Sequence, residues 1–168
     1  IILIQNKALE LSLFLSLPAS IALILGSEQI ISALFGYGSF DKTAVKNSAL
    51  ALYYFSFGLP AFAFIKVFSS FFFANHDTKT PFYISFISVL LNVFISLYYF
   101  KTVGFIIIPI ATSISSWFNS IILFIYLKRK NLFYFNKNFI IKFFKISFTS
   151  LLTILFFNYL ISKFENLL

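Results

Sequence analysis

Long apolar runs, separated by short polar interruptions, fill most of the chain. Five of them approach the roughly 20 residues that an α-helix needs to cross a bilayer, and they cover about 9–26, 48–72, 81–100, 104–127 and 143–162. The third and fourth carry no charged residue, and none shows the alternating pattern of a membrane β-barrel. Because hydrocarbon offers backbone groups no hydrogen-bond partner, each segment must close its own bonds. The pattern therefore predicts five transmembrane helices.

The first polar interruptions predict where helices begin and end. Gly26 suits the end of the first span. Ser27 is expected to cap a short interfacial helix over 27–35, with Glu28 in its first turn, where the helix dipole favours an anion. Asp41 is expected to cap the helix that leads into the second span.

A polar loop, residues 75–80, joins the second and third runs. We expect Thr80 to be the N-cap of the third span and Pro81 to be its first residue, which makes the loop a tight connection between antiparallel helices. His76 and Asp77 are adjacent in this loop. An acid–base pair needs a pocket with convergent geometry, and nothing nearby in the sequence supplies one. Loop packing and interfacial hydrogen bonding are therefore favoured over catalysis.

The amino-acid composition favours a membrane protein over a soluble one. Of the 168 residues, 60% are hydrophobic and 11% are charged, against roughly 25% charged in soluble domains. A soluble fold of this size has too much surface for its volume to hide so many apolar side chains. We expect a single membrane domain over 1–168, and the lack of Met indicates a fragment of a longer protein. With no Cys, one His and five acidic residues, the chain offers little for thiolate, metal or triad chemistry.

The distribution of positive charge predicts an orientation, because Lys and Arg favour the cytoplasmic side of a membrane. If loop 75–80 is cytoplasmic, nine of the 13 Lys and Arg residues lie at or near that face, and so does the N-terminal end. The cluster KRK at 128–130 is attributed to this rule and to anionic headgroups rather than to nucleic acid. The nine are Lys7, Lys66, Lys79, Lys128, Arg129, Lys130, Lys137, Lys142 and Lys145, and the other four are Lys42, Lys46, Lys101 and Lys163.

Lys66 is a charge surrounded by apolar sequence in the second run. Charges inside a membrane are costly and usually face a partner or a cavity. Because the polar loop is about nine residues away, the side chain could also extend to the headgroups. Snorkelling or structural pairing, and a place in a cavity, both stay open for Lys66.

Polar side chains also interrupt the third and fourth spans. Asn92 and Ser96 share one helix face, since they are four residues apart. Hydrogen bonding between helices is one interpretation. The alternative is a polar cavity wall, or a cation site built from oxygen ligands such as the Asn92 and Thr112 side chains. The stripe in the fourth span contains Thr112, Ser113, Ser115, Ser116 and Asn119.

Three prolines, Pro18, Pro60 and Pro109, lie inside predicted spans. Each removes a helix hydrogen bond and is expected to kink its helix. Kinked helices suit transporters, whose helix bundles rearrange, although static bundles contain them too.

Several short motifs, spread along the chain, together form a recognisable pattern. Residues 58–81 contain Gly58-Leu59, Lys66, Phe72-Phe73, Asp77 and Thr80-Pro81, and a turn earlier in the chain contains Leu34-Phe35, Gly38 and Phe40. With LPASIALILGSEQIISALF before them and GFIIIPIATSISSWFNSIILFIYLKRK after them, these residues resemble the C-terminal half of the MurJ/MviN family. The family comprises bacterial lipid II flippases of the multidrug/oligosaccharidyl-lipid/polysaccharide exporter superfamily. The resemblance covers about 5–131, and the last span matches only in hydropathy.

The resemblance implies a fold and a place in it. Family members have fourteen spans in two lobes, with both termini in the cytoplasm. This chain looks like spans nine to thirteen, most of the second lobe. The basic residues that bind the substrate pyrophosphate belong to the first lobe and to span eight, outside this sequence. The last two spans form a groove for the lipid tail, and only one of them is present here.

The resemblance also implies an ion site, because some members bind sodium through oxygen ligands. Asn92, the backbone oxygen of Ile108, and Thr112 have compatible spacing. Where the family leads us to expect an acid one turn after the Asn, this chain has Ser96. Coupling to sodium or to the membrane potential is the expectation, with no other cofactor.

The predicted protein is thus an all-α, multi-pass protein of the bacterial inner membrane. By the resemblance, it is expected to move undecaprenyl-linked lipid II, the peptidoglycan precursor, to the outer leaflet by alternating access, without making a covalent bond. Its expected partners are that lipid, membrane lipids and the first lobe of the same protein. An exporter of another polyprenyl-linked oligosaccharide or a drug is the close alternative, and a non-transporting scaffold for the cell-wall machinery is the second. An enzyme acting on polyprenyl phosphates would require clustered acids or histidines that the sequence lacks.

Overall fold

The computed structural model describes residues 2–38, 41–134 and 137–165, and the regular structure in these ranges is helical throughout. The expected all-α class is therefore confirmed. In chain order the elements are α1 (Ile2–Leu25), α2 (Ser27–Phe35), α3 (Lys42–Ser56), α4 (Leu59–Ala74), α5 (Lys79–Val103), the 3-10 turn η1 (Gly104–Ile106), α6 (Ile107–Arg129) and α7 (Lys137–Glu165).

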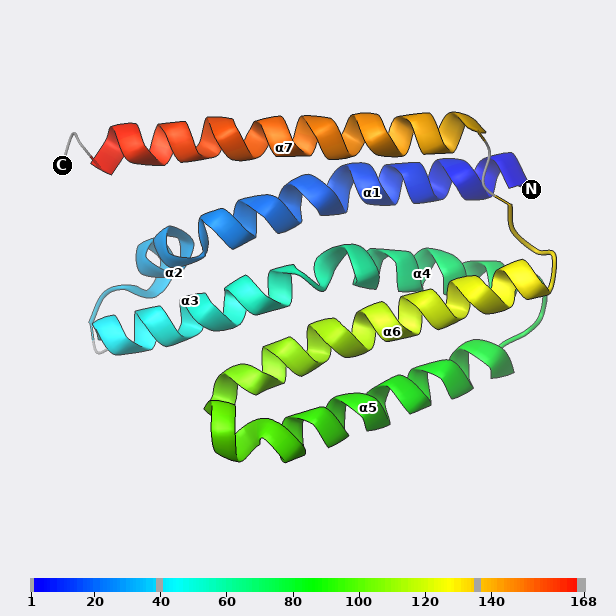
Figure 1. Ribbon diagram of the computed structural model, residues 1–168, viewed down its shortest axis with the longest axis horizontal. Helices are drawn as coiled ribbons and strands as arrows, with labels where there is room; N and C mark the ends of the chain where they lie inside the picture. Colours follow the sequence, from blue (N-terminus) through cyan, green and yellow to red (C-terminus); the bar gives the residue numbers. More distant parts are fainter. Residues whose placement is uncertain (1, 39–40, 135–136, 166–168) are drawn as a thin grey trace.

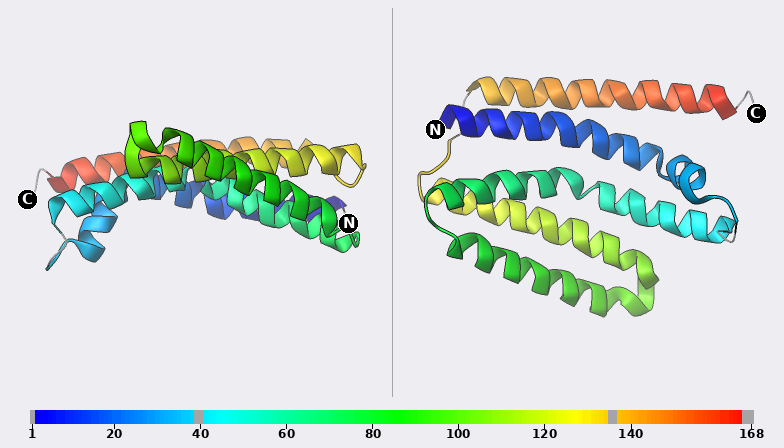
Figure 2. Two further views of the ribbon diagram at one scale, coloured as in Figure 1. Left: turned by 90° about the horizontal axis from the view of Figure 1, so that it is seen from below. Right: turned by 180° about the vertical axis from the view of Figure 1, so that it is seen from behind.

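The long helices lie side by side in a curved layer (Figures 1 and 2). α7, the last helix, packs beside α1, the first. α1 contacts both α3 and α4, these two contact α6, and α6 forms a hairpin with α5. An ion pair between Lys142 and Glu10, with 2.8 Å between Nζ and Oε1, joins α7 to α1.

Two helical runs among the described residues, Leu3–Leu25 and Lys79–Arg129, are long and apolar enough to cross a membrane. The second run folds back on itself at Gly104, whose φ of 74° suits glycine, and it therefore supplies both α5 and α6. The bent pair of α3 and α4 forms a third candidate span. The predicted second span is thus not one straight helix over 48–72, because it breaks between Ser56 and Leu59.

Two predicted helix starts are wrong, and one is confirmed. Gly26, not Ser27, occupies the N-cap position of α2, and no side chain caps that helix. α5 begins at Lys79 instead of Pro81, because the Asp77 carboxylate accepts the hydrogen bond of a first-turn amide. Asp41 caps α3 as expected, since its Oδ1 accepts from the Ala44 N–H at 2.7 Å.

The three prolines have different effects. α1 continues through Pro18 without a break. Pro109 is the third residue of α6, in the first turn, where a missing N–H costs no helix bond. Pro60 alone accompanies a break, since it is the second residue of α4, directly after the break between α3 and α4. Only one of the three expected kinks therefore corresponds to an interruption of the helix.

Aromatic side chains form the centre of the main core, where α1, α4 and α6 meet. Phe72 and Phe133 are almost completely buried, and Phe71 stacks on Phe133 with 5.9 Å between the ring centroids. On the outside, large apolar side chains are exposed, for example Leu97 at 73%. Such a surface would cause aggregation in water but matches lipid.

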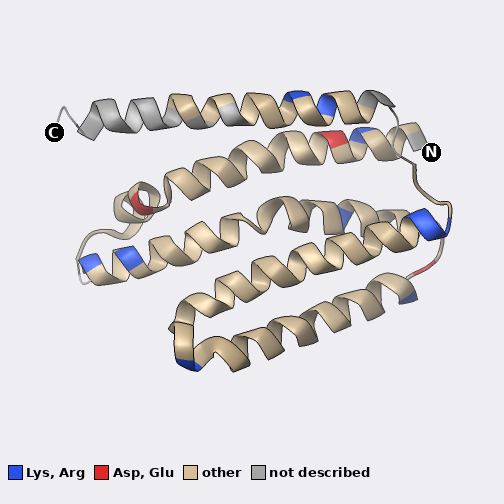
Figure 3. Ribbon diagram, viewed as in Figure 1, with Lys and Arg blue, Asp and Glu red and all other residues tan. Residues whose placement is uncertain are grey.

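Lys and Arg residues lie mainly at the end of the layer that holds the start of the chain and the α4–α5 and α6–α7 connections (Figure 3). A smaller group lies at the opposite end, at the start of α3 and at the turn between α5 and α6. The side chains of Lys137 and Lys163, and the whole of Phe40, lie outside the described residues. Lys and Arg are thus unevenly distributed between the two ends of the layer, and the positive-inside rule uses such a difference to predict orientation.

Candidate functional site: a helix break and a polar groove

The break between α3 and α4 follows from the local sequence. A helix carbonyl normally accepts from the N–H four residues later, and Pro60, four residues after Ser56, has no N–H. The N–H of Gly58 turns to the Phe55 carbonyl at 2.9 Å. It therefore leaves the carbonyl of Tyr54 as well as that of Ser56 without the usual backbone donor. The two helices bend by 42° at this point.

Side chains from neighbouring helices satisfy the carbonyls at the break. Ser20 of α1 donates to the Ser56 carbonyl, and Ser113 of α6 donates to the Tyr54 carbonyl, both at 2.6 Å. The Trp117 indole N–H donates to the Phe57 carbonyl at 2.9 Å. Because unpaired backbone groups are costly in hydrocarbon, these three bonds make the break stable and tie it to α1 and α6.

A polar groove lies beside the break, between α4, α5 and α6. Its volume is about 280 Å³. The groove brings together five of the side chains that the sequence singled out, although they come from two different helices: Asn92 of α5, and Thr112, Ser115, Ser116 and Asn119 of α6. Its full lining is Phe62, Ile65, Ser85, Ser88, Val89, Asn92, Thr112, Ser115, Ser116 and Asn119.

A chain of hydrogen bonds joins α5 to α6 in this groove. The Asn92 amide donates to Thr112 Oγ1 at 3.0 Å and to Ser115 Oγ at 3.3 Å, and Thr112 Oγ1 donates to the Ile108 carbonyl at 2.8 Å. Further along, the Asn119 amide donates to Ser85 Oγ at 3.3 Å. The interpretation as hydrogen bonding between helices thus has a geometric basis.

Some polar atoms in this region form no hydrogen bond. The Asn119 Oδ1 and Ser96 Oγ atoms are buried without a hydrogen-bond partner. Buried polar atoms usually have partners, so these two atoms retain unused capacity to form hydrogen bonds.

The suggested cation ligands can be tested against this geometry. Asn92, Ile108 and Thr112 lie in one hydrogen-bonded chain, and hard cations prefer such oxygen donors. Asn92 presents its NH₂ group, not its oxygen, to Thr112, and no carboxylate belongs to the lining. Among the described residues, no three His, Cys, Asp or Glu side chains gather in a metal-binding cluster. The groove thus lines up neutral oxygen atoms without the negative charge that holds a cation tightly.

Replacing Asn92 by alanine should weaken the α5–α6 hairpin. We expect a loss of about 0.6–1.7 kcal/mol, the usual range for polar contacts between membrane helices, measured as a lower thermal unfolding temperature in detergent. Thr102→Ala on the same helix is the control, because Thr102 bonds only locally to the Tyr99 carbonyl. Equal stability of both variants would contradict a structural role for Asn92.

Lys66 does not line the polar groove. It belongs to a different groove, between α1 and α4, together with Ser12 and Ser16. The structure therefore separates Lys66 from the other cavity candidates, which the sequence had grouped with it.

Asp77 and Thr80 belong to a network at the ends of α4 and α6. Asp77 accepts hydrogen bonds from the Thr80 N–H at 3.0 Å and the Thr80 hydroxyl at 2.7 Å, and from Lys130 Nζ at 2.5 Å. Lys130 also lies over the Phe72 ring, 5.7 Å from its centroid. The bonds from Lys130 and Thr80 lower the pKa of the Asp77 carboxyl from 3.8 to about 2. Pro81, the third residue of α5, is buried.

Both helix ends in this network have the same geometry. His76 and Asn131 have left-handed φ values of 57° and 53°. In each case the two N–H groups that follow the cap bond back to the last turn: His76 and Asp77 to α4, Asn131 and Leu132 to α6. These are Schellman motifs. His76 therefore has a role in the backbone of the loop, in agreement with the packing interpretation of the sequence.

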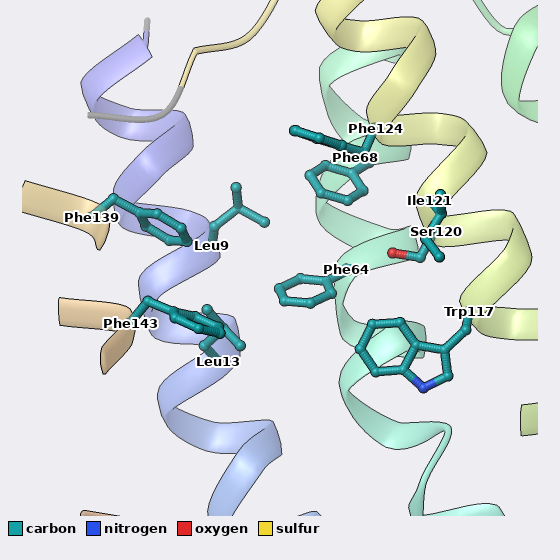
Figure 4. A pocket seen from close by; sticks show the side chains of 10 residues that line it. All are labelled: Leu9, Leu13, Phe64, Phe68, Trp117, Ser120, Ile121, Phe124, Phe139 and Phe143. Atoms are coloured by element: carbon teal, nitrogen blue, oxygen red, sulfur yellow. The ribbon is translucent and has the colours of Figure 1, made fainter. Parts of the chain in front are cut away.

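A third feature is an apolar cavity of about 230 Å³. Leu9 and Leu13 of α1 and two phenylalanines of α7 form one side of it, and residues of α4 and α6 face them (Figure 4). Its chemistry suits an alkyl chain. The full lining is Leu9, Leu13, Phe64, Phe68, Trp117, Ser120, Ile121, Phe124, Phe139 and Phe143.

Sequence reasoning missed the residues that stabilise the break. Pro60 signals that the Ser56 carbonyl needs another donor, but nothing local shows that Ser20 supplies it from 36 residues away. Trp117 and the partner of Lys130 were likewise invisible, because these contacts join distant parts of the chain.

Known proteins with similar sequences belong to one family. The sequence model of the family described as "Lipid II flippase MurJ" matches residues 2–167. A probable lipid II flippase MurJ of Rhizobium meliloti is 42% identical over 123 residues, which are 72% of this chain and 23% of that protein. Its counterpart in Rickettsia prowazekii is 37% identical over 123 residues, 73% of this chain and 24% of that protein.

A solved structure, described as lipid II flippase MurJ in the inward closed conformation, has the same arrangement of helices. It superposes with a TM-score of 0.80 at 29% sequence identity, and covers 93% of this chain and 32% of the solved chain. The chain thus spans about a quarter of the length of the curated relatives that it matches. Because the family model matches almost the whole length of this chain, the chain belongs to the lipid II flippase MurJ family.

Proposed function

We propose that the protein containing this chain is a flippase that carries lipid II from the inner to the outer leaflet by alternating access. The observation that carries the proposal is the match of residues 2–167 to the family, and the likeness to a lipid II flippase structure supports it. No covalent bond is made or broken. The work is a shift between inward- and outward-facing states.

The geometry is compatible with such motion. Alternating access requires helices that change their packing within the membrane. The break between α3 and α4 is a point at which two half-helices could change their angle, and among the described residues three side-chain bonds from α1 and α6 hold it. The polar groove beside it would supply the moving helices with alternative hydrogen-bond partners.

We infer the position and orientation of the chain from charge and family together. The chain would form most of the second lobe, from spans nine to thirteen, in the bacterial inner membrane. The end with more Lys and Arg would face the cytoplasm. The first lobe of the same protein would complete the cavity and provide the basic residues for the substrate pyrophosphate.

Ion coupling is proposed through the groove of α5 and α6 or through the membrane potential. Ser96→Asp would place a carboxylate one turn from Asn92. We expect this variant of the complete protein to show transport that sodium stimulates more strongly, because an anionic oxygen binds a cation far better than a hydroxyl does. The measurement is lipid II translocation at equal ionic strength in sodium and in choline, with Ser96→Asn as the neutral control. If sodium stimulates both variants equally, the site does not bind it.

The rival functions predict different results. An exporter of another polyprenyl-linked oligosaccharide or of a drug would use the same fold, and a scaffold for the cell-wall machinery would keep partner binding with no transport to lose. The deciding experiment expresses the complete protein in a bacterium depleted of its own lipid II flippase and measures lipid II in the outer leaflet. Restored exposure and growth are expected. Protein that is present in the membrane without restored exposure would overturn the proposal.

A further inference from the structure

A groove of about 430 Å³ between α1 and α4 contains a positively charged side chain. Lys66 of α4 lines it, and Ser12 and Ser16 of α1 line the facing side. Ala19 and Ala63 have short side chains and keep the groove open. The remaining lining is apolar, from Leu15, Leu59, Phe62 and Val67.

The charge of Lys66 is not balanced within the part of the chain that the structure describes. The ion pairs there are Lys130 with Asp77 and Lys142 with Glu10, and no acidic residue lines the groove. Lys66 lies eight residues before the end of α4, which corresponds to a rise of about 12 Å. Lys66 is exposed in the described part of the chain, and a charge within a membrane-spanning segment usually has a partner of opposite sign, which an anion would provide here.

The serines add neutral donors to this charge. Ser12 and Ser16 are four residues apart and therefore share one face of α1. Ser16 Oγ is buried and has no hydrogen-bond partner. A hydroxyl and an ammonium group can both donate to an oxyanion, whereas the apolar walls would accept a hydrocarbon chain. A free inorganic anion would not use those walls.

We propose that the groove between α1 and α4 binds the phosphate or pyrophosphate group of a membrane lipid, through Lys66 Nζ and the hydroxyls of Ser12 and Ser16. Two lipids carry this chemistry: the polyprenyl pyrophosphate of lipid II, which rests on the proposed function, and an anionic phospholipid. The site is separate from the polar groove of α5 and α6, with which it shares only Phe62.

The test uses the complete protein, purified in detergent and stripped of lipid. Native mass spectrometry measures the binding of lipid II, phosphatidylglycerol and the neutral diacylglycerol. Lys66→Gln should weaken the binding of one or both phosphate lipids about tenfold, because it removes a charge-assisted hydrogen bond. It should leave diacylglycerol unchanged, and Lys66→Arg should retain most of the binding. Lys46→Gln, a loss of one charge on α3, is the matched control.

A second variant leaves the charge of Lys66 in place, so that the proposal can still be tested if Lys66→Gln does not fold. Ser12→Ala with Ser16→Ala should weaken binding of the same lipid about threefold, since two neutral donors are lost. If Lys66→Gln lowers thermal stability while all lipids bind as before, Lys66 pairs with an acid elsewhere in the protein and the proposal is wrong. Unchanged binding in both variants would overturn it equally.

The outcomes also separate this site from the proposed function. If the unmodified protein translocates lipid II but the variants bind both phosphate lipids normally, the site fails and the flippase stands. If only phosphatidylglycerol binding depends on Lys66 and no lipid II is translocated, the site stands as a phospholipid site and the flippase fails.

Discussion

Replacing Gly58 by leucine is expected to abolish lipid II translocation and to destabilise the protein by about 3 kcal/mol. A Cβ at this position would lie 3.0 Å from Ser113 Oγ, 3.1 Å from Phe62 and 3.2 Å from Ser116 Oγ. A leucine adds three further carbons where there is no space, and overpacking of this kind costs about 1–3 kcal/mol. It would also push α6 away from the break, so that Ser113 and Trp117 lose their bonds to the Tyr54 and Phe57 carbonyls.

The measurement combines thermal unfolding in detergent with outer-leaflet lipid II in cells that depend on the variant. Ala74→Leu is the control on the same helix, because Ala74 is exposed at the end of α4. The control should fold and transport normally. Normal stability of Gly58→Leu would show that α6 is not packed tightly against the break.

Replacing Asp77 by asparagine should destabilise the protein by about 1–2 kcal/mol at neutral pH. The carboxylate accepts three hydrogen bonds, one of them from the Lys130 ammonium, and bonds to charged groups contribute about 1.5–3 kcal/mol each when shielded. The expected effect is smaller than their sum because Lys130 is 44% exposed and water screens the pair. The loss should appear as a lower unfolding temperature, with Glu28→Gln in the exposed part of α2 as the control.

The same network predicts a pH dependence with a definite sign. The folded-state pKa of Asp77 is about 2, below the ordinary value of 3.8. The stabilisation is therefore complete above about pH 4 and is lost as the pH falls from about 4 toward 2. The difference in unfolding temperature between the original protein and Asp77→Asn should shrink over this window. A constant difference down to pH 2 would contradict the assignment of the low pKa to Asp77.

Much of the fold could be predicted because the bilayer imposes simple rules. The length of each apolar run gave the long helices, since a segment in hydrocarbon must close its own backbone bonds. Local chemistry located Asp41 as a cap, because that bond spans only three residues. It failed at Thr80, where an acid three residues earlier could cap the helix sooner. Local chemistry also did not show which proline would interrupt its helix, since α1 and α6 continue through Pro18 and Pro109 while the chain breaks before Pro60.

The candidate site could be predicted from the sequence only in part. Asn92 and Thr112 could be proposed as neighbours because a hairpin brings the third and fourth spans together, and the structure joins them by a hydrogen bond. For Lys66 the sequence left snorkelling, structural pairing and a place in a cavity open. The structure places it in a separate groove with α1, which shares only Phe62 with the polar groove, since the direction of a side chain depends on the rotation of its helix.

The sequence by itself thus determined a membrane protein of long helices, a positively charged end and the family to which it belongs, because hydropathy, charge and short motifs are properties of consecutive residues. Only the tertiary structure decided how the break in the second span is stabilised, which polar side chains share a groove, and that Asp77 pairs with Lys130. Each of these depends on residues far apart in the chain, and their contact follows from how the helices pack against one another.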